Sequence, residues 1–137
     1  MTAHQAGKVM HLVVGPDEHG VVRHARLVAE ACGHPVLRAE RPAEVNLDRL
    51  VAADVVHLPY TDRLFGPTCE AAAAAYEALV DPVRAAGVSI SVTLHDLPAG
   101  SSPLQVRRRA AYHRVVAAAR GVAVSYTHLT LPTTPYV

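Results

Sequence analysis

The sequence predicts an α/β fold, with a Rossmann-like parallel sheet and helices on both faces. Short apolar runs that stop at Gly, Pro or His alternate with longer segments of helical periodicity. The connections between them are short, and strands that alternate with helices over short loops form parallel sheets covered on both faces. Half of the 137 residues are hydrophobic and 18% are charged, which indicates one folded domain and excludes intrinsic disorder.

The predicted strands are apolar or alternating runs bounded by turn residues. Residues 8–14 are rich in β-branched side chains and stop at Gly15 and Pro16. Residues 54–58 form a similar run that ends at Pro59. The predicted strands, in order, are residues 8–14, 35–39, 54–58, 88–94 and 121–124.

The predicted helices carry recognisable start and stop signals. Gly33 follows the first helix where a left-handed cap is needed, and Asn46 caps a brief second helix. The Ala-rich third helix contains Pro82, which is expected to bend it or divide it in two. Ser102 and Pro103 open the fourth helix. The predicted helices are residues 21–32, 47–50, 68–86 and 103–119.

Composition excludes several classes of function. Thirteen Lys and Arg against twelve Asp and Glu leave a net charge of +1, so no nucleic-acid partner is expected. No apolar stretch reaches the roughly 18 residues of a membrane span. Cys32 and Cys69 lie far apart, without a disulfide framework or metal-binding spacing. We therefore expect a reduced, cytoplasmic protein.

Positive charge is concentrated near the end of the chain. Residues 97–137 contain five Arg and no acidic residue, and four of them, Arg107, Arg108, Arg109 and Arg114, lie on one predicted helix. One interpretation is a solvated helix face. The other is a face for phosphate or for anionic lipid, which would place the protein peripherally at the inner face of the membrane.

Residues 125–137 differ in composition from the rest of the chain. They contain four Thr and no Ala, Gly or charged side chain, whereas the preceding residues are rich in Ala, Arg and Val. Our hypothesis is that the domain comprises residues 1–124, that the native protein continues past about Val124, and that the tail is non-native or disordered.

Three loops follow the predicted strands at the edge where parallel α/β sheets bind ligands: residues 15–20, 58–66 and 95–102. Gly15 and Gly20 bracket a turn from a strand into a helix N-terminus, which attracts phosphate. The turn lacks the Lys and Ser/Thr of a Walker loop. The alternative is that both glycines only permit a tight turn.

Polar side chains follow the third and fourth predicted strands. His95, followed by Asp96, can donate to a sugar hydroxyl or phosphate or act as a general base, or it can cap the strand end. Tyr60 and Asp62 can bind a polyhydroxylated ligand or serve as turn residues. The nine histidines show no metal-ligand spacing, so no metal site is expected.

Three motifs in this order resemble the N-terminal domain of retaining GT-B glycosyltransferases of the family 4 type. His19-Gly-Val-Val-Arg-His24 resembles their Gly-Gly-Val-x-Arg-His turn, with His19 in place of the first Gly. Asp54-Val-Val-His57 and Val92-Thr-Leu-His-Asp96 resemble two of their strand ends. The match covers essentially residues 8–125, as the N-terminal half of a GT-B fold.

The resemblance implies an acceptor-side domain that transfers a sugar from a nucleotide-sugar donor with retention, without metal or cofactor. It implies that the donor phosphates lie at Gly15, His19 and Gly20, and that His95 is catalytic. The residues that would bind the acceptor, a small molecule or a lipid-linked one, are Arg23, Tyr60, Asp62 and Asp96.

The resemblance also implies that a nucleotide-binding domain with a Glu-x7-Glu motif should follow in sequence. Without it, these 137 residues are expected to be inactive alone. Two alternatives stay open. The chain is a stand-alone, non-catalytic flavodoxin-like module that binds a phosphate-bearing ligand, or a non-catalytic subunit that completes an active site with another chain.

Overall fold

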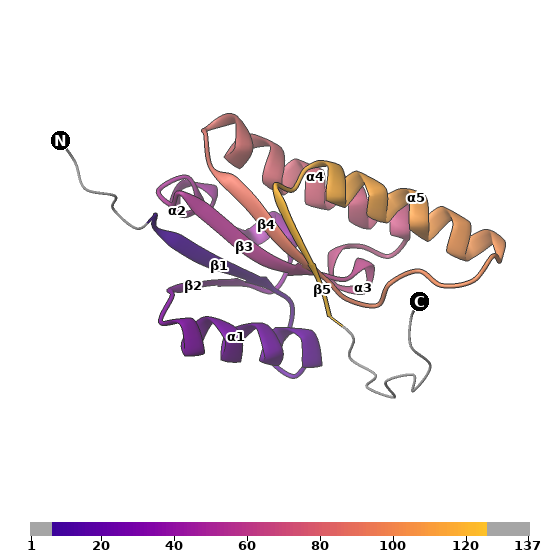
Figure 1. Ribbon diagram of the computed structural model, residues 1–137, viewed down its shortest axis with the longest axis horizontal. Helices are drawn as coiled ribbons and strands as arrows, with labels where there is room; N and C mark the ends of the chain where they lie inside the picture. Colours follow the sequence, from indigo (N-terminus) through magenta and orange to yellow (C-terminus); the bar gives the residue numbers. More distant parts are fainter. Residues whose placement is uncertain (1–6, 126–137) are drawn as a thin grey trace, which may run out of the picture.

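The computed structural model describes residues 7–125, in which strands and helices alternate along the chain (Figure 1). In chain order the elements are β1 (Val9–Val14), α1 (Gly20–Cys32), β2 (Val36–Ala39), the 3-10 turn η1 (Pro42–Glu44), α2 (Leu47–Leu50), β3 (Val55–Tyr60), α3 (Asp62–Phe65), α4 (Cys69–Ala85), β4 (Ser89–Leu94), α5 (Pro103–Ala117) and β5 (Gly121–Val124).

All strand pairings in the five-stranded sheet are parallel, and the strand order is β2-β1-β3-β4-β5. This is the doubly wound, flavodoxin-like order. Strand β2 is added on one side of the central pair β1 and β3, and β4 and β5 are added on the other side. Helix α1 covers one face, and α4 and α5 cover the other (Figure 1). The predicted α/β class is therefore confirmed.

The two faces of the sheet differ in polarity because side chains alternate along each strand. On β4, Ile90, Val92 and Leu94 are buried toward α4 and α5, while the intervening Ser89, Ser91 and Thr93 are only partly buried on the other face. The main hydrophobic core lies on the apolar face. Its largest fully buried side chains include Tyr60, Tyr76, Leu12 and Leu58.

Strand β3 continues beyond the predicted stop at Pro59 and includes Tyr60. Asp54 O accepts from Ser89 N and Tyr60 O accepts from His95 N, so the even-numbered residues of β3 form their backbone bonds with β4. Pro59 therefore faces β1, whose pairing with β3 ends at His57. A proline fits there because its missing N–H removes no bond from the ladder.

Helix α4 is one continuous helix, so the expected division at Pro82 does not occur. Leu79, Val80 and Val83, on either side of the proline, are buried in the core, and this packing holds both turns in one helix. Helix α3 lies in what the sequence predicted as a loop. A single turn of helix has too few residues for a periodic signal.

The capping residues read from the sequence have the expected geometry. Gly33 has a φ of 70° in the left-handed region, and its amide bonds carbonyls at the end of α1. Asn46 accepts from Asp48 N at 3.1 Å, and Ser102 Oγ accepts from Gln105 N at 3.3 Å. In the described part of the chain, no helix has the length and apolar character to cross a membrane. The hypothesis about the tail falls, from residue 126 on, outside the described residues.

We predict that replacing Pro82 with Ala raises the free energy of unfolding by about 1–3 kcal/mol, because Ala restores a backbone donor inside α4. Chemical denaturation measures the change. Pro67 precedes α4 in an exposed turn, and Pro67→Ala is the matched control, expected to lower stability by less than about 1 kcal/mol. Equal effects of the two substitutions would contradict the prediction.

Candidate functional site

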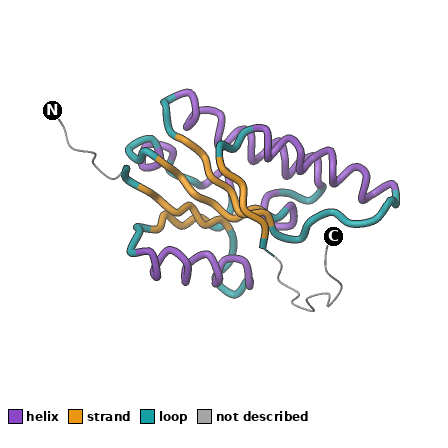
Figure 2. Tube along the Cα trace, viewed as in Figure 1, coloured by secondary structure: helices purple, strands orange, loops and turns teal. Residues whose placement is uncertain are grey.

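The carboxyl ends of β1, β3 and β4 meet at one edge of the sheet (Figure 2). The sequence placed its three candidate loops at these ends. The first loop keeps its predicted place between β1 and α1. The second is shortened by the extension of β3 and contains α3, and the third joins β4 to α5. We call this region the strand-end site. It comprises residues 15–20, Thr61, His95 and Asp96.

Gly15 is required by the fold. Its φ of 132° is one that side chains rarely adopt, and a Cβ atom there would lie 2.9 Å from both Leu64 Cδ2 and Val22 Cγ2. Arg38 Nη2, from β2, donates to Gly15 O at 2.7 Å and holds the turn in place. Backbone conformation and packing together account for Gly15 without a bound ligand.

Gly20 and His19 differ from Gly15 in this respect. A Cβ atom on Gly20, the first residue of α1, would meet no atom within 4 Å other than its chain neighbours and the nearby helix backbone, so packing does not demand a glycine. His19 is the N-cap, and its Nδ1 accepts from Val21 N at 3.1 Å. The helix N-terminus carries partial positive charge. Open space over Gly20 therefore leaves this end of α1 accessible to an anion.

His95 is held firmly by its backbone, while its ring has no partner. His95 N donates to Tyr60 O at 2.8 Å, and Tyr112 Oη donates to His95 O, also at 2.8 Å. The side chain is 1% exposed, and neither ring nitrogen has a hydrogen-bond partner among the described residues. An unpartnered buried polar group costs about 1–3 kcal/mol and calls for an explanation.

The His95 ring borders a cavity of about 30 Å³ between α1 and the sheet, which His24 and Thr93 also line. The ring centroids of His24 and His95 lie 6.2 Å apart, edge to face. Burial, aided by His24, lowers the pKa of the His95 imidazole. His95 is therefore neutral at pH 7 and presents one donor and one acceptor nitrogen.

Asp96 follows with a strained backbone. Its φ of 53° is uncommon outside glycine, although Asp tolerates it better than most residues. Thr61 Oγ1, from the end of β3, donates to Asp96 Oδ2 at 2.9 Å, and Tyr112 Oη lies 3.3 Å from Asp96 O. Strain of this kind persists only where surrounding contacts hold the residue, and it is concentrated at functional sites.

Two residues that the resemblance assigns to acceptor binding are buried in the structure. Tyr60 is fully buried, with its ring centroid 4.9 Å from that of Phe65 and 5.2 Å from that of Tyr112. Burial raises the pKa of its phenol. Asp62 is buried in an ion pair with Arg108. The structure therefore presents neither side chain freely at the surface, whereas Arg23 on α1 is exposed and Asp96 is exposed at the edge.

The sequence did not single out Arg108 and Tyr112 as parts of the site. Arg108 Nε donates to Asp62 Oδ2 at 2.8 Å, and both side chains are largely buried, at 15% and 10% exposure. Tyr112 Oη reaches both carbonyls after β4 and lies 3.4 Å from Asp62 N. Their spacing of four on a helix was the available signal, because it places them on one face.

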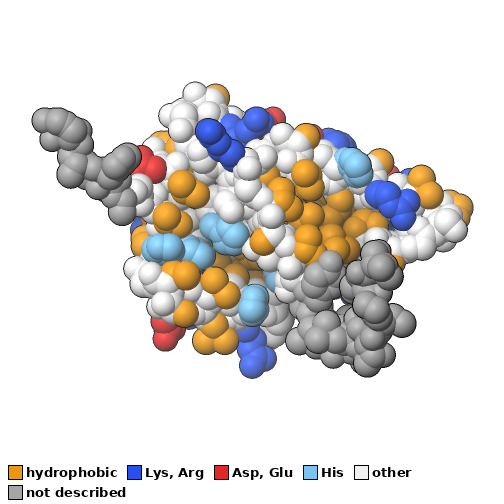
Figure 3. All heavy atoms as spheres, in the orientation of Figure 1, with side chains coloured by type: hydrophobic (Ala, Val, Ile, Leu, Met, Phe, Trp, Pro, Cys, Tyr) orange, Lys and Arg blue, Asp and Glu red, His pale blue; other side chains and the backbone are white. Residues whose placement is uncertain are grey.

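Histidines gather on the polar face of the sheet beside α1 (Figure 3). His11 Nε2 lies 3.0 Å from His34 Nδ1, and the His11 and His57 ring centroids are 5.3 Å apart. His57 pairs through its two nitrogens with Ser91 Oγ and Thr93 Oγ1, each at 2.9 Å. In residues 7–125, no group of three or more His, Cys, Asp or Glu is arranged to hold a metal ion.

The four arginines of α5 are mostly engaged with groups of the chain itself. Arg107 pairs with Glu70 and Arg114 with Glu77, which joins α5 to α4. Arg108 binds Asp62, and Arg109 donates to Gly100 O at 2.6 Å. These contacts neutralise much of the charge that the sequence suggested for a membrane surface. Membrane contact stays a prediction.

Comparison with known proteins supports the fold. No protein-family model matches the chain, and no curated protein matches it. A crystal structure of a pilus assembly-related protein from Burkholderia pseudomallei is similar, with a TM-score of 0.50 and 22% identity, over 90% of this chain and 83% of that chain. At this identity the similarity shows the α/β fold alone.

We predict that Arg108→Met lowers the free energy of unfolding by about 3 kcal/mol, because it leaves the buried Asp62 carboxylate without its partner. Arg107 lies on the same helix as Arg108, and Arg107→Met breaks its exposed pair with Glu70 of α4, which is expected to cost less than about 1 kcal/mol. Urea unfolding of both variants makes the comparison. A loss for Arg108→Met no larger than for Arg107→Met would refute the ranking.

We also predict that stability falls as the pH drops from about 6.5 to about 4. Burial, with His57 and His34 nearby, lowers the pKa of His11 to about 4 from 6.5. Because the folded state binds its proton less tightly than the unfolded state, the stabilisation is complete above the unfolded pKa and is lost through this window. The loss attributable to His11 is about 3 kcal/mol.

Thermal unfolding at several pH values tests this linkage. His11→Gln is expected to flatten the dependence between pH 6.5 and 4, whereas replacing the exposed His113 of α5 with Gln should leave it unchanged. A His11→Gln variant with the same pH dependence as the parent chain would show that His11 is not its source.

Proposed function

We propose that the chain is the N-terminal, acceptor-side domain of a retaining GT-B glycosyltransferase of the family 4 type, and that its strand-end site binds the phosphates of a nucleotide-sugar donor. The observation that carries the proposal is the buried, unpartnered His95 ring, which lies beside His24 in the second turn of α1. Free imidazole nitrogens and a positive helix end, held at one sheet edge, suit a ligand with both sugar hydroxyls and phosphate.

The glycine pair supports this proposal by contrast. Packing explains Gly15 but gives no reason for Gly20, above which the space is open. A glycine at such a position lets a phosphate approach the first amides of α1 closely. His19 Nδ1 already accepts a hydrogen bond from Val21 N, so we assign the donor phosphate to the amide of Gly20 and to Nε2 of His19.

In this proposal His95 contacts the donor sugar or the reacting hydroxyl. Its ring is closed off from solvent in the structure, so this contact requires the exposed His24 side chain to move aside. Arg23 and Asp96, which are exposed, would bind the acceptor directly. Asp62 would act indirectly, by holding Arg108 in place beside the acceptor. Tyr60 would also act indirectly, because its buried ring packs beneath the end of β3.

Transfer requires groups that bind the nucleotide and neutralise the leaving diphosphate, and these would come from a second Rossmann-like domain. The site needs no metal or cofactor in this proposal, because the α1 N-terminus and the second domain bind the phosphates. We propose a cytoplasmic location, since the donor is a cytoplasmic metabolite class. Peripheral contact with the membrane would depend on the arginines of α5.

A second candidate function is a stand-alone, non-catalytic module that binds a phosphate-bearing ligand. The strand order favours it, since β2-β1-β3-β4-β5 is the flavodoxin-like order, with its phosphate site at the same helix end. Both candidates place an anion at α1. They differ in whether a nucleotide sugar is turned over once a nucleotide-binding domain is supplied.

We predict that Gly20→Ala weakens binding of inorganic pyrophosphate about tenfold, because the added methyl group blocks approach to α1. The same change should leave stability unchanged or raise it by about 0.5–1 kcal/mol, since nothing contacts the new Cβ. Amide chemical shifts of residues 19–22 report binding, and denaturation reports stability. Gly15→Ala, at the other end of the loop, is expected to destabilise the fold instead.

The outcomes separate the alternatives. Pyrophosphate shifts confined to residues 19–22 and to the His95 ring, and lost in Gly20→Ala, support the strand-end site. Undiminished binding to Gly20→Ala overturns it. Sugar transfer after addition of a nucleotide-binding domain distinguishes the glycosyltransferase domain from the binding module.

A further inference from the structure

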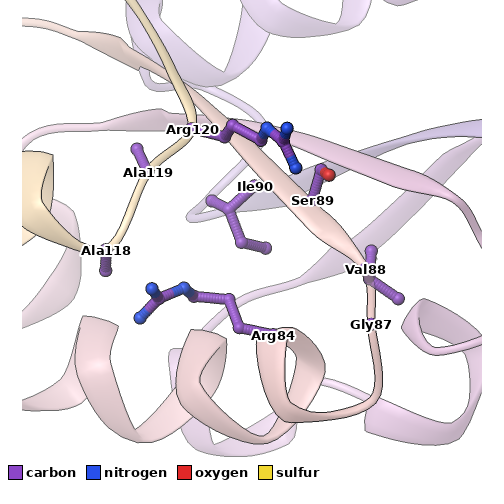
Figure 4. Close-up of a pocket in the computed structure, with 8 residues that line it drawn as sticks. All are labelled: Arg84, Gly87, Val88, Ser89, Ile90, Ala118, Ala119 and Arg120. Carbon is purple, nitrogen blue, oxygen red and sulfur yellow. The ribbon is translucent and has the colours of Figure 1, made fainter.

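A cavity of about 400 Å³ lies at the edge of the sheet opposite to the strand-end site (Figure 4). The end of α4, the start of β4 and the connection from α5 to β5 line it, and it is open to solvent. Ile90, on β4, lies between the side chains of Arg84 and Arg120 in the view of Figure 4. We call this the amino-edge cavity.

Two guanidinium groups border the amino-edge cavity and point to different parts of it. Arg84 extends from the last turn of α4 toward Ala118 at the end of α5, and Arg120 extends toward Ser89 at the start of β4 (Figure 4). The backbone of Arg120 is fixed, because its amide donates to Ile90 O at 2.7 Å. The two charges therefore come from separate elements that the sheet holds in place.

The residues that line this cavity carry a net positive charge. No carboxylate lines it. Asp81 lies 3.7 Å from Arg84, but both side chains are about half exposed, and such pairs contribute little. Arg120 has no ion pair among residues 7–125. Each helix C-terminus contributes about −0.5 charge, so α4 and α5 together offset roughly half of the two positive charges.

The arginines are not needed to cap the two helices. Amides of Ala86, Gly87 and Val88 already donate to carbonyls in the last turn of α4. Ala118 and Ala119 donate to the corresponding carbonyls of α5. Helix capping therefore does not require the guanidinium donors of Arg84 or Arg120.

We propose that the amino-edge cavity binds a small metabolite that carries two separated anionic groups, one at each arginine. A guanidinium binds a carboxylate or phosphate through two parallel hydrogen bonds, which suits one acid group for each side chain. The volume falls within the range of small-molecule sites. This inference is independent of the function proposed for the strand-end site, because the two sites lie at opposite edges of the sheet.

Titration of the full chain with succinate, followed by amide chemical shifts, tests the proposal. We expect shifts at Ser89, Ala119 and Arg120, with a dissociation constant on the order of 1 mM. Acetate, which has a single carboxylate, should bind about tenfold more weakly at the same amides. Arg84→Gln and Arg120→Gln should each weaken succinate binding about tenfold, and Arg49→Gln, on the exposed surface of α2, is the matched control.

Both arginines are exposed, so their replacement is not expected to disrupt the fold. An unchanged amide spectrum away from the cavity shows that each variant still folds. Loss of the succinate shifts in both variants, but not in Arg49→Gln, supports the site. Equal binding of acetate and succinate, shifts that persist in both variants, or no shifts at these amides would overturn it. Shifts at residues 19–22 report the strand-end site separately.

Discussion

The geometry of the strand-end site depends on the way that α5 fastens the ends of β3 and β4. Tyr112 donates to His95 O, and Arg108 binds the carboxylate of Asp62 just after β3. These contacts come from one face of one helix and are largely buried, so each is worth more than an exposed contact of the same kind. They fix the backbone from which His95 and Asp96 project.

A second constraint is the unequal polarity of the two sheet faces. The apolar face packs against α4 and α5 and contains most of the hydrophobic burial. The opposite face places His11 and His57 under or beside α1, where burial keeps these imidazoles neutral by lowering the pKa of each. Attachment of α1, and with it the position of the Gly15–Gly20 loop, is therefore more sensitive to acid than the main core.

Unpartnered groups are found at both edges of the sheet, but they differ in kind. At the carboxyl edge, the buried His95 nitrogens and the α1 N-terminus suit a polar, anionic ligand. At the amino edge, Arg84 and Arg120 line a cavity whose lining includes no carboxylate. On α5, by contrast, Arg107 pairs with Glu70 and Arg114 pairs with Glu77. These arginines form ion pairs between α5 and α4.

The sequence by itself determined the alternation of strands and helices and the caps at Gly33, Asn46 and Ser102, because periodicity and capping are local properties. It also placed Gly15 and His95 directly after strands and Gly20 at the start of a helix. It did not determine the extension of β3 past Pro59, the continuity of α4 through Pro82, or the burial of Tyr60. Nor did it identify Arg108 as the partner of Asp62, 46 residues away. Only the tertiary structure decided these features, since each depends on which residues the packed helices and neighbouring strands bring into contact.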